Sequence, residues 1–496
     1  MIRKWDDGLY TKLEEYGKSD YYPFHMPGHK RQVDHPFLRE FGNPYEVDIT
    51  EIDGFDNLHH PEGILKESMR KMASYYGADH SYYLVNGSSC GILSAICGTT
   101  HNSDTILMSR NCHKAAYHGV FLNQLNVVYT YPQIIREFGV QGGLSTDEIE
   151  DMLKTYVDIS SVFVVSPTYD GIVSNIQKIS TICHNYGVPL IVDEAHGAHF
   201  RYGEKLPVSA LDLGADVVIQ SLHKTLPSFT QTAVMHVKEG YVDVERIEHY
   251  LQIFQSSSPS YIFMAGMERC VEYMNSDGED GGKGQMGQFL ERLEKIREEL
   301  KDMKKLRLLD RDVVGSYEVY DLDPSKVVVS TRGAGIGGEQ LEVWLRERYH
   351  LEMEMCSVDY VTAITTLMDT EEGLLRLKDA FLEIDRQLQK NGKEAYDCSQ
   401  EIDGCERENG HITCIKKSVM TIHQAWNSEK EQIRIEESAG RTSGEYIYVY
   451  PPGIPLIVPG EMISEEIVNT VLQYKREGLS VQGLKDYQAE YILVVR

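Results

Sequence analysis

The segment from Val188 to Thr225 constrains the fold of this chain more than any other. It reads VPLIVDEAHGAH, then a connector, then ADVVIQSLHKT, so two short apolar runs are each followed at once by polar residues. Both runs are too short to cross a membrane and have the length of buried β-strands. The first predicted strand ends at Asp193, with His196 three residues later, and the second leads into Lys224.

An acid and a lysine at the ends of two strands suit a pyridoxal phosphate site. The lysine can form a Schiff base with the aldehyde, and the acid can pair with the pyridine nitrogen so that the ring accepts electrons. Each residue also has a simpler interpretation. Lys224 could be a solvated strand end, and Asp193 with Glu194 could cap a helix or bind a metal ion. The segment taken alone leaves these alternatives open.

Strand and helix patterns alternate through much of the chain. Predicted strands include 82–85, 104–108, 162–165 and 232–237, and helical periodicity follows several of them, as at Ile176, Ile179 and Ile182. This alternation predicts an α/β region with a largely parallel sheet. Ligands of such sheets bind beyond the carboxyl ends of the strands.

Polar residues follow several of these predicted strands. A Gly/Ser turn at 86–91 opens a helix, where it can hold a phosphate or simply cap the helix. The predicted strand ends carry the Ser88–Ser89 turn, His113, Thr168, Asp193 and Lys224. Their shared placement is a stronger indication of a ligand site than any single motif.

Length and charge limit the classes of partner. The chain has 496 residues, enough for two or more domains, and its formal net charge of -27 argues against nucleic acids and anionic membranes. The charge is compatible with a cationic substrate. The N-terminal residues lack the apolar core of a signal peptide, and no apolar run is long enough to span a bilayer, so we expect a cytoplasmic protein.

The cysteines predict neither disulfides nor a metal site. Nine of them are scattered along the chain, and the closest group, Cys398, Cys405 and Cys414, contains no paired CxxC.

The pattern of segments predicts the domain organisation. We expect an N-terminal segment at 1–60, a large ligand-binding domain at 61–325 and a C-terminal part at 326–496, where the strand and helix pattern restarts. Residues 391–411 are polar and acidic and are expected to be an exposed linker or insertion. A Gly-rich stretch at 276–287 is expected to be flexible and to precede a charged helix.

A proline-rich stretch at 450–461 forces a fixed, non-helical backbone. Such a backbone can hold a carboxylate in place, or it can be only a rigid turn. Glu461 in this stretch, with Glu51 and Asp53 in an early polar loop, are the candidate acids for a basic substrate, because a guanidinium favours a bidentate pairing with a carboxylate.

Together these motifs resemble the ornithine/lysine/arginine decarboxylase family, which has the aspartate-aminotransferase-like fold, fold type I of pyridoxal phosphate enzymes. Six motifs occur in the family's order: His25-Met26-Pro27-Gly28-His29-Lys30, Asn86-Gly87-Ser88-Ser89, Asn111-Cys112-His113-Lys114, Asp193-Glu194-Ala195-His196-Gly197, Ser221-Leu222-His223-Lys224 and Tyr450-Pro451-Pro452-Gly453-Ile454-Pro455. The chain looks most like the short bacterial arginine decarboxylases, because the N-terminal wing domain of the longer members is absent.

The resemblance implies a role for each matching residue. Lys224 would be the Schiff-base lysine, Asp193 the partner of the ring nitrogen, and His113 the residue stacked on the ring, with Lys224 or His223 returning a proton after decarboxylation. The implied phosphate ligands are Ser88, Ser89, Cys90, Ser221 and His223, with Ser257 contributed by a second subunit of a homodimer. Thr168 and His196 are further candidates for cofactor binding. Ser88-Ser89-Cys90 departs from the family's usual Thr-Ser-Thr or Thr-Ser-Gly.

The implied activity is decarboxylation of a basic amino acid, with L-arginine giving agmatine for polyamine metabolism. Lysine or ornithine are alternative substrates. An aminotransferase or lyase on the same fold would need an arginine for the substrate carboxylate, for which Arg332 is available. A regulator that binds the cofactor without turnover is a third alternative.

Overall fold

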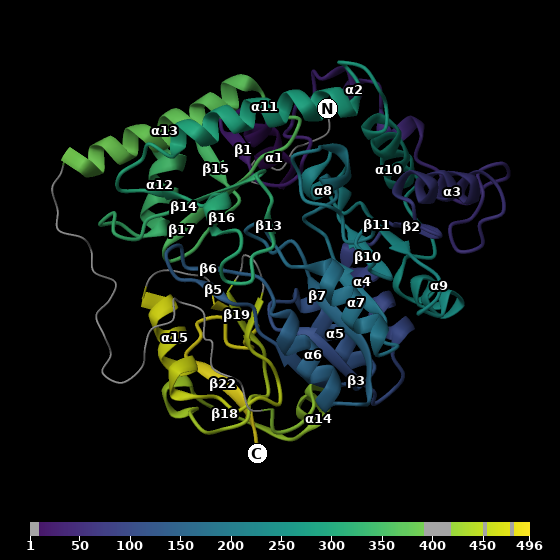
Figure 1. Ribbon diagram of the computed structural model, residues 1–496, viewed down its shortest axis with the longest axis vertical. Coiled ribbons are helices and arrows are strands. Elements are labelled where there is room, and N and C mark those ends of the chain that lie inside the picture. Colours follow the sequence, from purple (N-terminus) through teal and green to yellow (C-terminus); the bar gives the residue numbers. More distant parts are fainter. Residues whose placement is uncertain (1–8, 391–417, 450–453, 477–480) are drawn as a thin grey trace.

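The computed structural model describes residues 9–390, 418–449, 454–476 and 481–496 (Figure 1). The predicted linker at 391–411, the three clustered cysteines and residues 450–453 of the proline-rich stretch lie outside these ranges.

A seven-stranded sheet forms the centre of the large domain. Its strands, in spatial order, are β2 (His80–Leu84), β11 (Ala233–Val237), β10 (Val217–Gln220), β9 (Leu190–Asp193), β7 (Ile159–Val165), β3 (Thr105–Ser109) and β4 (Asn126–Thr130). Only β11 runs antiparallel to its neighbours among these strands. The predicted α/β fold with a largely parallel sheet is therefore confirmed.

Helices cover the sheet and explain the composition of its strands. Every residue of β3, β9, β10 and β11 is buried, as expected for strands that are covered on both faces. The covering helices include α4 (Gly87–Thr99), α5 (Lys114–Leu122), α6 (Thr146–Thr155), α7 (Ile176–Asn185) and α9 (Val244–Phe254). Further helices of this part are α3 (Ile64–Tyr76) and α10 (Tyr261–Met274).

A second, antiparallel sheet follows, with the order β12 (Arg307–Leu308), β14 (Lys326–Ser330), β17 (Tyr360–Ile364) and β16 (Met355–Cys356). Helices α11 (Gly282–Leu300), α12 (Gly338–Tyr349) and α13 (Glu371–Lys390) belong to this part, and α11 and α13 lie side by side in Figure 1. The N-terminal segment joins it, because β1 (Tyr22–Phe24) pairs in parallel with β15 (Leu351–Met353). The short helices α1 (Leu9–Lys18) and α2 (Pro36–Arg39) flank β1.

The Gly-rich stretch at 276–287 is not wholly irregular, which corrects the prediction of a flexible segment. Helix α11 begins inside it at Gly282, whose backbone N–H donates to Ser276 Oγ at 3.1 Å. A Cβ at this position would lie 2.5 Å from Met274 Cα, so glycine here permits close packing on α10 rather than flexibility.

The C-terminal part has its own small core. Strand β18 (Lys430–Arg434) pairs with β22 (Tyr491–Val495), and a second sheet has the order β20 (Ile454–Ile457), β19 (Ile447–Val449) and β21 (Val481–Gln482). Helix α15 (Glu465–Arg476) packs on these strands, and α14 (Ile422–Asn427) contacts α5 of the large domain. Figure 1 shows this part, in yellow, against the large domain.

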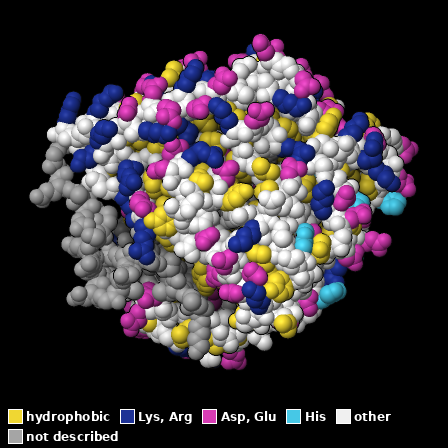
Figure 2. All heavy atoms as spheres, viewed as in Figure 1, with side chains coloured by type: hydrophobic (Ala, Val, Ile, Leu, Met, Phe, Trp, Pro, Cys, Tyr) yellow, Lys and Arg dark blue, Asp and Glu magenta, His cyan; other side chains and the backbone are white. Residues whose placement is uncertain are grey.

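Acidic and basic side chains are interspersed on the face drawn in Figure 2, without a continuous basic patch on that face. In the part of the chain that the structure describes, no helix is both long and apolar enough to cross a bilayer.

Candidate active site

The carboxyl edge of the central sheet gathers the predicted site residues. Asp193 ends β9 and lies between Val165 of β7 and Ile219 of β10 in the strand register. Strand β10 continues into the short helix α8 (Leu222–Thr225), which carries Lys224. Strand β3 leads to His113, the N-cap of α5. Because parallel strands end at the same edge of a sheet, residues far apart in the sequence meet there.

Lys224 is a half-buried side chain with few hydrogen-bond partners among the described residues. Its Nζ lies 3.0 Å from His196 Nε2. Burial lowers the pKa of Lys224, and the nearby carboxylates of Asp193 and Glu354 partly oppose this effect. A buried lysine with a lowered pKa is more readily the neutral amine that a covalent reaction requires.

Asp193 is 5% exposed, and its Oδ1 accepts a hydrogen bond from the Ala195 backbone N–H at 3.1 Å. Burial raises the pKa of Asp193, while the positive charge of Lys224 opposes the rise. A buried carboxyl group with one backbone donor is stabilised as an anion only if a cation lies against it. The position therefore suits a cationic ring nitrogen.

Two histidines border the lysine as neutral rings. Burial is the main cause that lowers the pKa of His113 to about 3 and of His223 to about 4, and the charge of Lys224 adds to it. His223 Nδ1 lies 2.8 Å from the carbonyl oxygen of Thr232, which can only accept, so Nδ1 carries the proton. His223 Nε2 is then the basic atom of that ring.

The start of α4 forms the second end of the site. Gly87 has a φ of +75°, and Ser88 and Ser89 follow in the first helical turn, where backbone N–H groups have no partner inside the helix. The Cys90 thiol donates to the Gly87 carbonyl at 3.0 Å and thereby holds the turn. These N–H groups can bind a phosphate.

Buried polar atoms without partners indicate that this edge is built for a ligand. Ser221 Oγ, Thr225 Oγ1 and His196 Nδ1 are buried and have no hydrogen-bond partner among the described residues. Such atoms are rare in folded proteins unless something else satisfies them. Thr168 differs, because its Oγ1 already accepts from the Ile172 backbone at 3.1 Å.

The sequence motifs did not indicate Glu354, which lies between β15, the partner strand of β1, and β16 of the second sheet. Its Oε2 accepts from the Met26 backbone N–H at 2.8 Å, and its Oε1 accepts from the Tyr169 hydroxyl. Tyr169 in turn packs on His196, with ring centroids 4.7 Å apart. Glu354 is thus a carboxylate whose charge acts on Lys224, and no motif around it in the sequence marks it.

The His25-to-Lys30 motif supports the lysine rather than lining the site as a free loop. Gly28 N–H donates to the His223 carbonyl at 2.7 Å, and a Cβ on Gly28 would lie 2.6 Å from the Leu226 carbonyl oxygen. The loop backbone therefore lies directly against α8. Lys30 Nζ is buried and donates to the carbonyls of Pro23, His25 and Ile364 at 3.1, 3.0 and 2.7 Å.

Other predicted residues lie apart from Lys224. Glu461 forms an ion pair with Arg110 at 3.2 Å. Asp53 is exposed, Glu51 lies near Tyr261, and Ser257 is exposed in the loop after α9. Arg332 donates to Asp359 Oδ2 at 2.6 Å through Nη2 and at 2.9 Å through Nε, so its guanidinium is already paired.

No cluster of three or more His, Cys, Asp or Glu side chains suited to a metal ion occurs in the described ranges.

The fold and this edge together define an α/β protein with a buried acid and a half-buried lysine at the carboxyl ends of two neighbouring strands. The profile of "Orn/Lys/Arg decarboxylase, major domain" matches residues 7–371, and the profile of its C-terminal domain matches residues 400–479. The chain belongs to the Orn/Lys/Arg decarboxylase family.

Individual relatives agree with this assignment. An arginine decarboxylase of Halalkalibacterium halodurans is 32% identical over 501 residues, covering 100% of this chain and 99% of that protein. The constitutive lysine decarboxylase of Escherichia coli is 25% identical over 555 residues, covering 94% and 76%. The crystal structure of the Francisella novicida lysine decarboxylase LdcF has a TM-score of 0.75 at 21% identity, covering 98% of this chain and 81% of that one, which supports the aspartate-aminotransferase-like fold.

The family implies pyridoxal phosphate, and the residues of this edge fit it. The unpartnered Ser221 hydroxyl and the free N–H groups of α4 suit a phosphate, Asp193 suits a protonated pyridine nitrogen, and Lys224 suits an aldehyde.

Proposed function

We propose that this chain is a pyridoxal-phosphate-dependent decarboxylase that converts L-arginine to agmatine and CO2. The observation that carries the proposal is the half-buried Lys224 with the buried Asp193 beside unpartnered hydroxyls at the sheet edge. The H. halodurans relative, matched along its whole length, supports arginine over the lysine that the more distant relatives are named for.

When bound, the cofactor supplies an electron sink for the electron pair released as the C–C bond breaks. The chain supplies the rest of the chemistry. Asp193 would keep the ring nitrogen protonated, and the first turn of α4 with Ser221 would hold the phosphate. Lys224 Nζ or His223 Nε2 delivers the proton that replaces CO2 at Cα.

For the distal end of the substrate, we nominate Glu354 as an additional acceptor. Its charge acts on Lys224, and both of its oxygens face donors that a guanidinium could replace or share. Glu461 already pairs with Arg110, which makes it a weaker candidate. Glu51 and Asp53 remain candidates if they reach the site of a second subunit.

A homodimer is part of the proposal. The segment around Glu51 and Asp53 exposes several large apolar side chains, and exposed apolar surface of this kind commonly marks an interface. They are Val33, Tyr45, Val47, Ile52, Phe55 and Ile64. The His59 ring contacts the Ser256 carbonyl at 2.7 Å, so this segment adjoins the exposed loop that carries Ser257. Sedimentation of the protein at twice the 56.5 kDa chain mass would support this arrangement.

A cytoplasmic location and a role in polyamine metabolism complete the proposal. The six cysteines within the described ranges are free thiols, which suits a reducing compartment.

A substrate panel tests the function. The wild-type protein with added cofactor is given arginine, lysine or ornithine, and CO2 and the amine product are measured. We expect agmatine from arginine, with a kcat/KM at least ~10-fold above that for the other two substrates. A keto acid product would instead show an aminotransferase, and absence of any product would favour the non-catalytic regulator.

The same panel with Glu354→Gln tests the substrate assignment. Loss of the carboxylate should raise the KM for arginine by about 10-fold or more, because a charge-assisted pairing contributes about 1.5–3 kcal/mol. Glu339→Gln, on the exposed start of α12, is the matched control. An unchanged KM in Glu354→Gln would reject Glu354 as the acceptor.

A further inference from the structure

A buried ion pair joins the C-terminal part to the loop that carries His113. Arg110 Nη2 lies 3.2 Å from Glu461 Oε2, and the two side chains are 6% and 2% exposed. Buried ion pairs seldom add net stability compared with apolar packing, although losing one partner is strongly destabilising. Such a pair can instead fix how two segments fit together.

Arg110 is held rigidly on its own side of the contact. Its guanidinium carbon lies 5.4 Å from the centroid of the Tyr117 ring and 5.3 Å from that of Tyr129. The Tyr117 hydroxyl accepts from Arg110 Nη1 and donates to the Arg110 carbonyl at 2.7 Å. The Arg110 backbone N–H donates to Thr130 at 2.9 Å. Movement of this guanidinium would therefore move the backbone of its loop.

The same loop places His113. Only Asn111 and Cys112 separate Arg110 from His113, and all three of Arg110, Asn111 and Cys112 are buried. His113 caps α5 by accepting from the Ala115 N–H at 3.2 Å. His113 and Lys224 follow β3 and β10 of the same central sheet, so the loop of Arg110 leads to the edge that carries this lysine.

Glu461 is fixed by the turn that follows β20. Its Oε2 also accepts from the Val458 N–H at 2.9 Å, and its carbonyl accepts from the Ser443 N–H at 2.8 Å. Gly460 has a φ of +93°, and a Cβ there would lie 2.3 Å from the Met420 carbonyl oxygen. The turn thus presents one carboxylate to the large domain.

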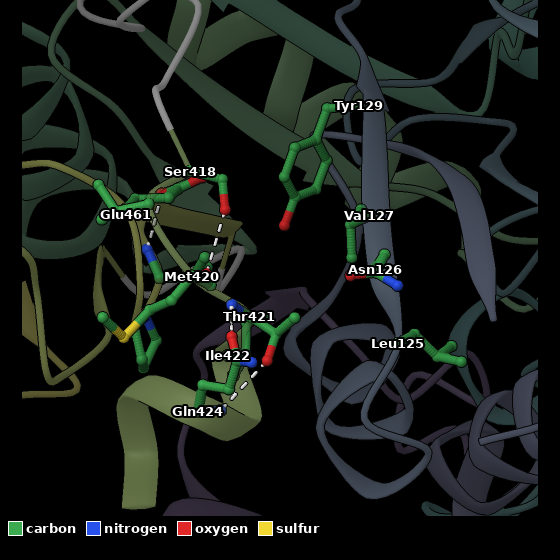
Figure 3. Close-up of a pocket in the computed structure, with 13 residues that line it drawn as sticks. Leu125, Asn126, Val127, Tyr129, Ser418, Met420, Thr421, Ile422, Gln424 and Glu461 are labelled. Carbon is green, nitrogen blue, oxygen red and sulfur yellow. Dashed lines mark hydrogen bonds between the residues drawn. The ribbon is translucent and has the colours of Figure 1, made fainter. Parts of the chain in front are cut away.

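The pair lies beside a cavity at the contact between the two parts. A cavity of about 320 Å³ separates β4 from the turn at 458–461 and from residues 418–424 (Figure 3). Tyr129 and Val127 lie on one side of the cavity in Figure 3, and Ser418 and Glu461 lie on the other. Apolar side chains of the C-terminal part, Ile422 and Val458, pack into the core of the large domain nearby, and the ion pair adds a directional, charged contact between the two parts.

We propose that Arg110 and Glu461 are a positioning pair, through which the C-terminal part orients the His113 ring over the bound cofactor. The C-terminal part then contributes to catalysis without touching the substrate. The activity readout rests on the proposed function, whereas cofactor affinity and the circular dichroism of the bound cofactor do not depend on which reaction is catalysed.

Glu461→Gln tests the pair, because glutamine keeps the shape and can still accept from Val458 while it leaves Arg110 without a counterion. We expect the dissociation constant for pyridoxal phosphate to rise by about 10-fold and the visible circular dichroism of the bound cofactor to change. We also expect kcat for arginine to fall by about 10-fold or more while KM stays within about twofold. These sizes follow from a misplaced contact worth about 1.4 kcal/mol or more.

Glu431→Gln is the matched control, because it breaks an exposed pair in the same C-terminal part, Glu431 with Arg441 at 2.6 Å. It should leave the dissociation constant for the cofactor, the visible circular dichroism, kcat and KM unchanged. The double variant Arg110→Met/Glu461→Met replaces the ion pair by an apolar contact. It serves as the test if Glu461→Gln does not fold. We expect it to recover stability but to retain the weak cofactor binding and the altered dichroism.

Two results would overturn the proposal. One is a Glu461→Gln protein that is less stable but binds the cofactor and turns over as the wild type does. The other is a double variant in which wild-type cofactor affinity and dichroism return together with stability. If the wild-type protein decarboxylates nothing, the proposed function fails, but the affinity and dichroism still decide the role of the pair.

Discussion

Lys30 is buried and Lys224 is half-buried, and the surroundings of their two amines differ. The ammonium of Lys30 has three carbonyl acceptors, one for each of its protons. Among the described residues, Lys224 has one hydrogen-bond partner, the His196 ring at 3.0 Å. Burial lowers the pKa of both amines.

This difference is the one expected between a structural lysine and the proposed reactive lysine. Three acceptors compensate the desolvation of Lys30 and connect the N-terminal segment, at Pro23 and His25, to Ile364 of the second sheet. Lys224 lacks this compensation, so its amine stays available for a covalent partner. Lys30 should therefore matter for stability, and Lys224 for chemistry.

Replacing Lys224 by alanine should have the largest effect. We expect the rate of CO2 release to fall by at least ~10³-fold, because the covalent partner of the cofactor is lost. The free energy of unfolding should change by no more than about 1 kcal/mol, since no saturated hydrogen-bond network is broken. Lys205→Ala, at an exposed lysine paired with Glu294, is the control. A Lys224→Ala protein with more than a tenth of the wild-type activity would reject the assignment.

Replacing Lys30 by methionine should lower the stability strongly and the activity only slightly, the reverse of Lys224→Ala. Loss of a buried cation that serves three carbonyls should lower the free energy of unfolding by about 2–5 kcal/mol, measured by urea denaturation. The activity of each folded molecule should fall far less than in Lys224→Ala. Lys66→Met, at an exposed position of α3, controls for the loss of a charge. Equal stability of the two methionine variants would contradict a structural role for Lys30.

The smallest expected effect concerns pH. The pKa of His223 is about 4 in the folded protein and ~6.5 when unfolded, so the unfolded chain binds more protons between these values. The histidine's contribution to stability is complete above pH ~6.5 and is lost as the pH falls towards 4, by about 1.4 kcal/mol per pH unit.

Urea denaturation of the wild type and His223→Gln at pH 7.5 and 5 measures this contribution. The variant should lose less stability on acidification than the wild type does. The wild type and the variant must be compared because burial raises the pKa of Asp170 to about 6. Protonation of Asp170 increases the stability of both proteins as the pH falls, which opposes the effect of His223. His60→Gln, at an exposed position, should behave as the wild type does. Equal losses in all three proteins would disprove the expected contribution.

The central sheet could be predicted from the sequence because its strands are continuous apolar runs. Asp193 and Lys224 could be predicted with it, since each stands directly after such a run and parallel strands end together. The sequence did not predict the start of α11, because glycine residues usually indicate a break in regular structure. Gly282 instead allows close packing against α10, a tertiary contact that no local sequence pattern indicates.

Long-range partners could not be predicted in the same way. Glu354 gains its position from Met26 and Tyr169, which lie 328 and 185 residues away. The proline-rich stretch did suggest a fixed carboxylate, but nothing near Glu461 in the sequence identifies Arg110, 351 residues away, as its counterion. Pairings of this kind depend on tertiary packing rather than on local propensity.

The contact of Gly28 with the end of α8 has a practical consequence for anyone who redesigns this scaffold. Even a methyl group at position 28 would collide with main-chain atoms of Thr225 and Leu226, which cannot swing aside as side chains can. Saturation mutagenesis of α8 alone would leave the close contact with Gly28 in place. Residues around Gly28 and residues of α8 therefore need to be varied together.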